Sequence, residues 1–313
     1  ASQKEKRRSA PDTADPWSLE TVDLEGCTWS LAGEAPPKTA VTAVARAIER
    51  GAPVWHVVGS GVPEHADGCG VPERADASSP ARRFFDQPFE DKFRYSVGAM
   101  DRSRGYEMYP HHLRYHKRRR AVDEFPERSE HLEPSAREFI VAERYVMGPP
   151  EATEEEDPYY SSPFGRVFFE RNVWPRDHDD LRHAMTALYG DMSVCAVAMA
   201  RVLAAALGAH WSAFDELLQR HHSRLQVNHY PSLRFEEGSS PPFRANAHHD
   251  TALLTLLARP TDQQSSSSSR PLPGALEIRD ESGLWRAVPT AKDALTCQLG
   301  SLAEYLTDGH LRA

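Results

Sequence analysis

The sequence lacks paired cysteines, and this absence excludes two classes of small, cross-linked domain. Its four cysteines are far apart and form no CxxC pair: Cys27, Cys69, Cys195 and Cys297. Neither a zinc ribbon nor a dense disulfide framework therefore fits the chain. Reduced thiols in the cytoplasm fit this cysteine usage best.

A membrane-spanning run and a secretory signal are also missing from the pattern. The most apolar stretch, residues 195–207, is short and contains Arg201, whereas a spanning helix needs about 20 apolar residues. Residues 1–10 are basic and polar, without the apolar centre of a secretory signal. We therefore expect no membrane partner.

Positive charge is in the minority. The chain has 37 basic and 46 acidic residues, a formal net charge of −9, whereas phosphate binding needs positively charged faces. We therefore expect no nucleic-acid partner. One basic run, residues 114–120, is interpreted as a solvated surface patch, with an anion or localisation site as the alternative.

What the sequence does contain is a helical first half and a β-rich second half. Helical spacing of apolar residues, ended by Gly51 and Gly208, predicts helices over residues 39–50 and 181–207. Other local patterns predict a buried strand at 53–58, a helix at 81–92 that a turn at Pro88 interrupts, and strands at 225–230, 252–257, 275–278, 285–288 and 295–299. This layout predicts an α+β fold whose strands form an antiparallel barrel or sandwich.

Three regions follow from this texture. Residues 1–36 are polar and rich in Pro and Asp, and we expect them to be poorly ordered. Residues 37–170 form an N-terminal region that is irregular over residues 98–165. Residues 171–313 contain the long helix and the β-rich segments.

The central candidate site is the tripeptide His248-His249-Asp250. On a strand, residues two apart point the same way, so His248 and Asp250 would project together and His249 would face the opposite side. One imidazole and one carboxylate are two thirds of the 2-His-1-carboxylate triad that leaves open positions on iron(II). The apolar run at 252–257 would anchor the pair to a rigid wall. The alternative is a purely structural role for His248.

His-x-Asp occurs twice more in the chain. One copy, His65-Ala66-Asp67, lies in a loop after the first predicted strand. The other, His178-Asp179-Asp180, opens the long helix, where Asp is expected as a capping residue. Both copies are interpreted as structural or incidental.

A second polar group lies about eighteen residues upstream of His248. Strand alternation puts Asn228 and Tyr230 on one face and His229 on the other. A polar face on a barrel strand indicates solvent or a polar cavity. Asn228 and Tyr230 have the donors to orient a dicarboxylate; a solvent-facing strand is the alternative.

These groups stand within a longer series of motifs. Asn228-His229-Tyr230-Pro231 is followed by His-x-Asp and an apolar Leu-Thr-x-Leu strand. Further stretches agree in order: VWHVVGSGV at 54–62, FFDQPFEDK at 84–92, RGY at 104–106, NVWP at 172–175, GLWRAVP at 283–289 and LTDG at 306–309. Together they resemble the isopenicillin-N-synthase-like oxygenases that depend on iron(II) and 2-oxoglutarate. Each motif is common, but the ordered set is specific and runs from about residue 40 to the last residue.

The resemblance implies a distorted double-stranded β-helix, or jelly roll, behind a helical N-terminal region. It implies that His248 and Asp250 are metal ligands, and that Tyr230, with Asn228, contacts 2-oxoglutarate. The implied cofactors are iron(II) and the co-substrate 2-oxoglutarate, with ascorbate as an accessory.

The implied reaction is the hydroxylation, desaturation or ring closure of a small organic substrate. It consumes molecular oxygen and releases succinate and carbon dioxide. Arg104 and Tyr106 are expected to contact the substrate, whose identity the sequence does not specify. A monomer is the state that the resemblance implies.

The pattern is incomplete at the C-terminal end. In the family a second histidine ligand follows shortly after the turn that 306–309 matches, and an Arg-x-Ser pair for the far carboxylate of 2-oxoglutarate comes later. His310 is too close to the turn to match that ligand, and Arg312 does not match the carboxylate-binding arginine. Gly300-Ser301 also stands where the family has Gly-Asp.

We therefore expect this sequence to be a fragment of a longer protein, with the last strands missing. A chain of this sequence alone should be marginally stable and a poor catalyst. The absence of an initiating Met agrees with this expectation. The alternatives are a catalytically inactive relative that acts as a binding or regulatory module, and a cupin-like protein that binds only a metal or a ligand.

Overall fold

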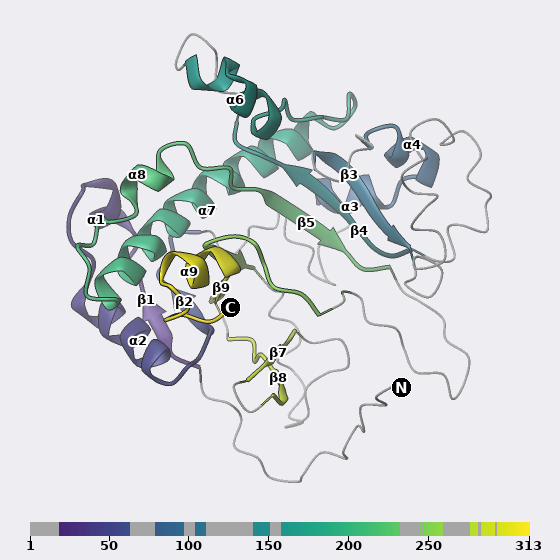
Figure 1. Ribbon diagram of the computed structural model, residues 1–313. Coiled ribbons are helices and arrows are strands. Elements are labelled where there is room, and N and C mark those ends of the chain that lie inside the picture. The colour runs from purple at the N-terminus through teal and green to yellow at the C-terminus, as the bar shows by residue number, and fades with distance from the viewer. Residues whose placement is uncertain are drawn as a thin grey trace, which may run out of the picture.

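The computed structural model describes residues 19–62, 79–96, 104–110, 140–150, 158–231, 245, 247–258, 276–280, 283–291 and 293–313. Over these residues the chain is a mixed α+β fold, as the sequence predicts (Figure 1). Several predictions fall outside the described residues: residues 1–18, His65-Ala66-Asp67, Cys69 and the basic run at 114–120.

The helices are α1 (Thr28–Leu31), α2 (Lys38–Glu49), α3 (Pro80–Phe85), α4 (Phe89–Phe93), the 3-10 helix η5 (Pro158–Ser161), α6 (Pro163–Phe168), α7 (Asp179–Ala206), α8 (Asp215–Leu218) and α9 (Ser301–Leu306). The strands are β1 (Thr21–Asp23), β2 (Val54–Val58), β3 (Gly105–Pro110), β4 (Ile140–Met147), β5 (Leu225–His229), β6 (Leu254–Leu257), β7 (Glu277–Arg279), β8 (Trp285–Ala287) and β9 (Leu295–Leu299). The three predicted helices and all six predicted strands are confirmed within a few residues.

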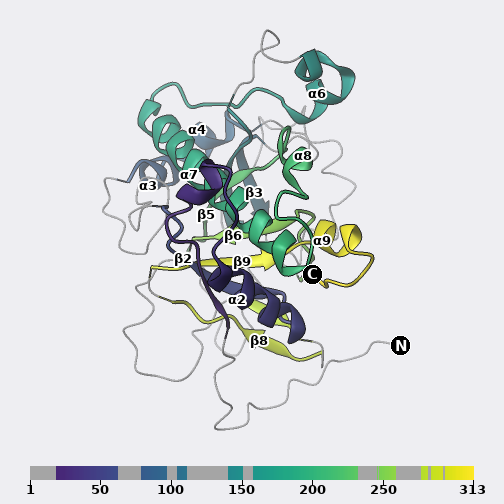
Figure 2. The ribbon, with the colours of Figure 1, turned by 90° about the vertical axis from the view of Figure 1, so that its left-hand side faces the viewer.

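The described strands form three sheets. The first has the order β1-β2-β9-β6, and the turned view shows β2, β9 and β6 side by side (Figure 2). The second has the order β3-β4-β5, and the third is the hairpin of β7 and β8. All pairs are antiparallel except β1 with β2, which is parallel. The antiparallel prediction therefore holds for every described pair except that of β1 with β2, and β2 also pairs antiparallel with β9.

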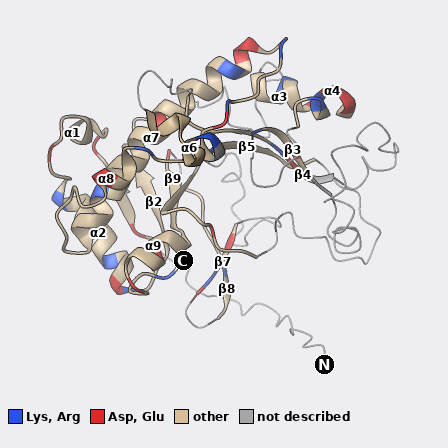
Figure 3. Ribbon diagram, turned by 45° about the horizontal axis from the view of Figure 1, so that its top comes forward, with Lys and Arg blue, Asp and Glu red and all other residues tan. Residues whose placement is uncertain are grey.

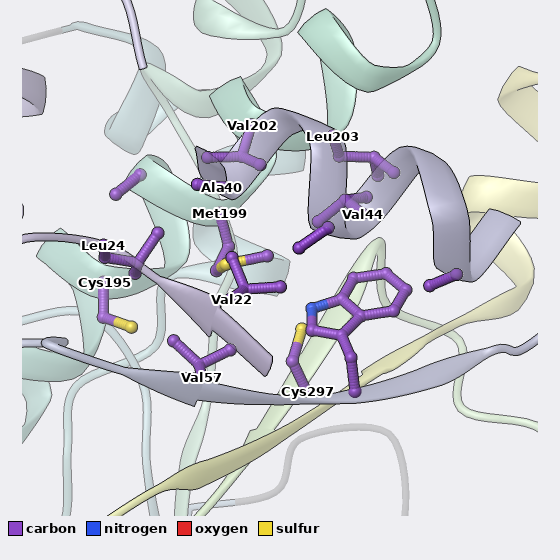
Figure 4. Packing of buried hydrophobic residues seen from close by; sticks show 14 of the residues in the cluster. Val22, Leu24, Ala40, Val44, Val57, Cys195, Met199, Val202, Leu203 and Cys297 are labelled. Atoms are coloured by element: carbon purple, nitrogen blue, oxygen red, sulfur yellow. The ribbon is translucent and has the colours of Figure 1, made fainter. Parts of the chain in front are cut away.

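Helix α7 joins two hydrophobic clusters. Its N-terminal half packs with α3, β3, β4 and β5, through Leu181, Met185 and Leu188. Its C-terminal half packs with α2, β1, β2 and β9, through Cys195, Met199 and Leu203 (Figure 4).

By length and composition α7 could cross a membrane, but half of its most apolar stretch is buried in the protein. The stripe of leucine and methionine is therefore core, as predicted.

Two predictions for the N-terminal half need correction. The described part of the segment expected to be poorly ordered, residues 19–36, is folded: it carries β1 and α1. It buries Val22, Leu24, Cys27 and Trp29. The stretch over 98–165, expected to be irregular, contains β3 and β4. The alternation in β4 was hidden because an inward position is occupied by a charged residue, Glu143, whose partners lie far away in sequence.

The three predicted regions are interleaved in space. Residue pairing between Trp55 of β2 and Cys297 of β9 places parts of the N-terminal and C-terminal regions in one sheet. A boundary near residue 170 stays a prediction. The functional consequence is that the segment around His248 is built on a sheet to which both ends of the chain contribute.

Candidate active site

His248 and Asp250 lie together, although not on a strand. The prediction that they are strand residues is wrong, because β6 begins only at Leu254. The two side chains nevertheless meet: His248 Nε2 is 3.4 Å from Asp250 Oδ1. His248 keeps 64% of its side chain exposed and Asp250 24%, so the pair faces solvent at the margin of the sheet.

The carboxylate of Asp250 is oriented by two hydrogen bonds to one of its oxygens. The Thr255 hydroxyl donates to Oδ2 at 2.6 Å, and the Gln298 amide donates to the same atom at 2.5 Å. Thr255 of β6 and Gln298 of β9 are register partners, so one cross-strand pair holds the carboxylate. This arrangement leaves Oδ1 directed toward His248.

The backbone of this segment is held by the start of α9. The amide of Ser301 donates to the carbonyl of Asp250 at 2.7 Å, and the amide of Leu302 donates to that of Ala252 at 3.3 Å. These are N-terminal helix amides, which have no partner within their own helix. A Cβ at Gly300 would overlap the carbonyl oxygen of Ala252 and lie 2.8 Å from its carbonyl carbon. Glycine at position 300 is therefore what permits the close approach.

The separation of the two donor atoms suits a shared metal ion. Imidazole nitrogen and carboxylate oxygen bind divalent metals such as zinc at about 2.1 Å, so two such ligands at right angles lie about 3 Å apart. The observed 3.4 Å between His248 Nε2 and Asp250 Oδ1 is close to that spacing. Within the described part of the chain, no group of three or more His, Cys, Asp and Glu side chains is arranged to hold a metal. This spacing would allow His248 and Asp250 to share a metal ion, and their role as metal ligands stays a prediction.

The other described His-x-Asp copy has a structural setting. His178 is the N-cap residue of α7, and its ring contacts the Gln87 side chain and the edge of Phe84. Asp180 pairs with Arg83 of α3. The interpretation of this copy as structural agrees with these contacts, which fix α3 against the start of α7.

The end of β5 presents its residues on two faces. Asn228 is exposed and Tyr230 is 51% exposed, whereas Val227 is buried and the His229 side chain is largely covered. This is the alternation that the sequence predicts. On the outward face Arg144 of β4 lies opposite Asn228 in the register and donates to Gln226 at 2.9 Å. A contact of Asn228 and Tyr230 with 2-oxoglutarate stays a prediction.

Behind β5 lies a buried polar cluster that sequence reasoning missed. Glu143 Oε2 accepts from Lys92 Nζ at 2.6 Å and from the Tyr106 hydroxyl at 2.5 Å. Glu143 Oε1 lies 2.8 Å from His229 Nδ1. The His229 ring stacks on Phe85, with 5.1 Å between ring centroids. The available signal was Glu143 at a position of β4 that alternates with the apolar side chains of Tyr145 and Met147, because a buried Glu implies a buried partner.

The cluster shifts the pKa values of its members. Burial alone would raise the pKa of Glu143, but the hydrogen bonds from His229, Lys92 and Tyr106 together hold it below its usual range. Burial, with the neighbouring Glu143 carboxylate, raises the pKa of Tyr106 far above its usual range. The carboxylate is therefore charged, and the phenol is a hydrogen-bond donor, across the neutral pH range.

The two residues expected to contact substrate lie in the interior. Tyr106 is wholly buried, with its hydroxyl engaged by Glu143. Arg104 is 3% exposed; its guanidinium lies over Gly148 and donates to the Phe168 carbonyl at 3.0 Å. Burial and the nearby Arg224 lower the pKa of Arg104. Their contacts in the structure are with the protein, and a substrate role stays a prediction.

Sequence comparison relates the chain to several oxygenases. No protein-family model matches it. Validamycin A dioxygenase from Streptomyces hygroscopicus subsp. limoneus is 29% identical over 172 residues, which cover 55% of this chain and 43% of that protein. The 2-oxoglutarate-Fe(II) type oxidoreductase hxnY from Emericella nidulans is 26% identical over 226 residues, covering 71% and 55%. The chain thus spans about half the length of these curated relatives.

Solved structures show the same fold. A protein from Caulobacter crescentus assigned to the 2OG-Fe(II) oxygenase family superposes with a TM-score of 0.64 at 20% identity, covering 95% of this chain and 78% of that one. The dioxygenase for auxin oxidation from rice gives 0.54 at 17% identity, covering 94% and 76%. This coverage of the chain gives no support to the expectation that its last strands are missing.

Proposed function

We propose that this chain, which belongs to the family of iron(II)- and 2-oxoglutarate-dependent oxygenases, oxidises a small organic substrate while converting 2-oxoglutarate to succinate and carbon dioxide. One observation carries the proposal: the 3.4 Å approach of His248 Nε2 to Asp250 Oδ1. An imidazole and a carboxylate held at that spacing match two thirds of the facial triad of such enzymes.

In this proposal His248 and Asp250 hold the metal, and Thr255 and Gln298 orient the carboxylate. Bound iron(II) supplies the activation of molecular oxygen that drives the oxidation. The hydrogen bonds from Thr255 and Gln298 keep Asp250 Oδ1 free for the metal and prevent rotation of the carboxylate. The backbone contacts of Ser301 keep the segment in place before metal arrives.

Asn228 and Tyr230 are proposed to orient 2-oxoglutarate, because both present hydrogen-bonding groups on the exposed face of β5. The sheets β1-β2-β9-β6 and β3-β4-β5 would be the described parts of a distorted jelly roll. Ascorbate as an accessory, a monomeric state and a cytoplasmic location belong to the same proposal. Hydroxylation, desaturation and ring closure are equally compatible with it.

One observation favours a second candidate, an inactive relative that serves as a binding or regulatory module. Among the residues that the structure describes, only two protein ligands converge. Two ligands hold iron(II) more weakly than three. The two candidates differ in turnover, since a binding module would take up metal or 2-oxoglutarate without releasing succinate.

The test is succinate release by the purified chain with iron(II), 2-oxoglutarate, ascorbate and oxygen. We expect metal-dependent succinate formation that His248→Ala and Asp250→Ala abolish. His249→Ala is the matched control, because His249 is exposed and lies between the two without sharing their contact. Binding of metal without any succinate would favour the module, and loss of activity in all three variants alike would contradict the assigned pair.

A further inference from the structure

The buried cluster behind β5 joins four separate elements at one point. Lys92 comes from α4, which carries charges of both signs (Figure 3), Tyr106 from β3, Glu143 from β4 and His229 from β5. Lys92 also donates to the Phe85 carbonyl at 2.8 Å. The side chains of Lys92 and Glu143 are 8% and 4% exposed, so the ion pair is almost fully removed from water.

Stability alone is a poor reason for such a pair. Removing two charges from water costs several kcal/mol for each ion, and apolar residues of similar volume often stabilise a fold as well. The cluster differs from a simple ion pair because both oxygens of Glu143 are engaged, by three donors with fixed directions. What these contacts determine is geometry: the side-chain position of His229 at the end of β5.

The position of His229 matters because of its neighbours. In a strand, adjacent side chains point to opposite faces, so fixing the ring of His229 on the inner face also fixes the outward directions of Asn228 and Tyr230. Two contacts hold that ring: the bond to Glu143 Oε1 and the stack on Phe85. Glu143 and His229 are also register partners across β4 and β5, so backbone pairing and side-chain contact coincide there.

We propose that Glu143 and His229 are positioning residues for the co-substrate. The buried cluster of Lys92, Glu143 and His229 fixes the end of β5 so that Asn228 and Tyr230 face 2-oxoglutarate. The inference rests on the proposed function. The pair His248 and Asp250 precedes β6 of the other sheet and is held by different contacts, from Thr255 and Gln298. The buried cluster therefore affects the affinity for 2-oxoglutarate and leaves the affinity for metal unchanged.

The test compares variants that keep or remove one donor. His229→Phe keeps a ring to stack on Phe85 but cannot bond to Glu143, whereas His229→Asn supplies an N–H near the position of Nδ1. The dissociation constants of Mn(II), and of 2-oxoglutarate with Mn(II) present, are measured by calorimetry on the full chain. We expect His229→Phe to weaken 2-oxoglutarate binding about tenfold, His229→Asn to restore most of it, and Mn(II) binding to stay as in the wild type.

The matched control is Tyr145→Phe. Tyr145 lies on β4 two residues from Glu143, is equally buried, and its hydroxyl donates to the Val173 carbonyl at 2.6 Å. Its loss removes a buried hydrogen bond without touching His229, so 2-oxoglutarate affinity should not change. If His229→Phe does not fold, Glu143→Gln replaces it; this change keeps the volume, and we expect weakened 2-oxoglutarate binding with unchanged Mn(II) binding.

Other outcomes overturn the inference. If His229→Phe and Tyr145→Phe weaken 2-oxoglutarate binding equally, or if Mn(II) affinity falls in parallel, the buried cluster supports the fold only. Unchanged 2-oxoglutarate binding in His229→Phe and Glu143→Gln would refute the positioning role of the buried cluster while leaving the proposed function intact. A wild-type chain that binds Mn(II) but not 2-oxoglutarate would overturn both.

Discussion

The two halves of the candidate site are held in opposite ways. The end of β5 is held by a buried ionic cluster centred on Glu143 of β4, whose donors are Lys92 of α4, Tyr106 of β3 and His229 of β5 itself. The pair proposed to bind metal, His248 and Asp250, lies on an irregular segment, with His248 mostly exposed and Asp250 oriented by one cross-strand pair. The proposed co-substrate side is thus fixed from within the core, whereas the proposed metal side is fixed by Thr255, Gln298 and the backbone of α9 and is partly exposed.

This difference predicts which property, stability or metal affinity, substitutions at each place should reduce first. Changes behind β5 disturb buried charges, so they should reduce the free energy of unfolding first. Changes around Asp250 disturb an exposed segment, so they should reduce metal affinity first. The following experiments test that separation, from the largest expected effect to the smallest.

The largest effect is expected from Glu143→Leu. The substitution leaves the Lys92 ammonium buried without its carboxylate, and removal of one partner of a buried ion pair costs about 3–5 kcal/mol. Urea denaturation measures the loss. The double variant Lys92→Met/Glu143→Leu should recover most of it, because no charge is then stranded.

The exposed pair Arg82–Asp86 of α3 is the control for that experiment. Asp86→Asn should change the free energy of unfolding by less than about 0.5 kcal/mol, because solvent screens the pair. A double variant as unstable as Glu143→Leu alone would mean that shape, rather than stranded charge, dominates the loss.

A smaller loss is expected from Gly300→Ala. The added Cβ would overlap the Ala252 carbonyl and push the start of α9 away from the segment that carries His248 and Asp250. The free energy of unfolding should fall by about 1–3 kcal/mol. Mn(II) affinity should fall with it. Gly190→Ala in α7 is the matched control: nothing lies within 4 Å of its added Cβ, so it should stabilise by about 0.5–1 kcal/mol. Similar losses in both variants would contradict the close approach.

Thr255→Val should affect metal binding more than stability. It removes one of the two donors to Asp250 Oδ2 while keeping the shape of the side chain. Loss of such an outer hydrogen bond costs about tenfold or more in metal affinity, measured as the Mn(II) dissociation constant. Retained affinity would mean that Gln298 alone orients the carboxylate.

The smallest effect is expected in acid. Because the pKa of Glu143 in the folded protein lies below its ordinary value of 4.5, its contribution to stability is present above that pH. The contribution is lost as the pH falls through the lower, folded value. The free energy of unfolding should therefore decline more steeply below pH 4.5 in the wild type than in Glu143→Gln. Parallel declines would assign the acid sensitivity to other carboxylates.

Much of this fold could be predicted from sequence because local patterns and local contacts agree. The helix α7, the strand β2 and the strands from β5 to β9 all form where the patterns predict them, and α7, β2 and β9 bury most of their apolar residues. The sequence predicts that His248 and Asp250 meet, and they do so in an irregular segment before β6, held by the start of α9, rather than on a strand.

The rest could not be predicted, for a physical reason. Glu143 looks like an interruption in an apolar run until Lys92, Tyr106 and His229 are brought to it from distant parts of the chain. Likewise β1 has a polar sequence and becomes a strand only by pairing with β2. Single-sequence patterns indicate which residues favour burial, but not which distant partners make the burial of a charge possible.

The position of β9 has a consequence for synthesis of the chain. It is the inner strand between β2 and β6, and β2 is complete at Val58, long before Leu295 emerges from the ribosome. The segment that carries Asp250 cannot acquire its Gln298 contact until that late strand has docked. If His248 and Asp250 bind metal as proposed, metal uptake should therefore wait for β9, so a chain stalled before Leu295 would bind metal weakly however much of its helical half had already formed.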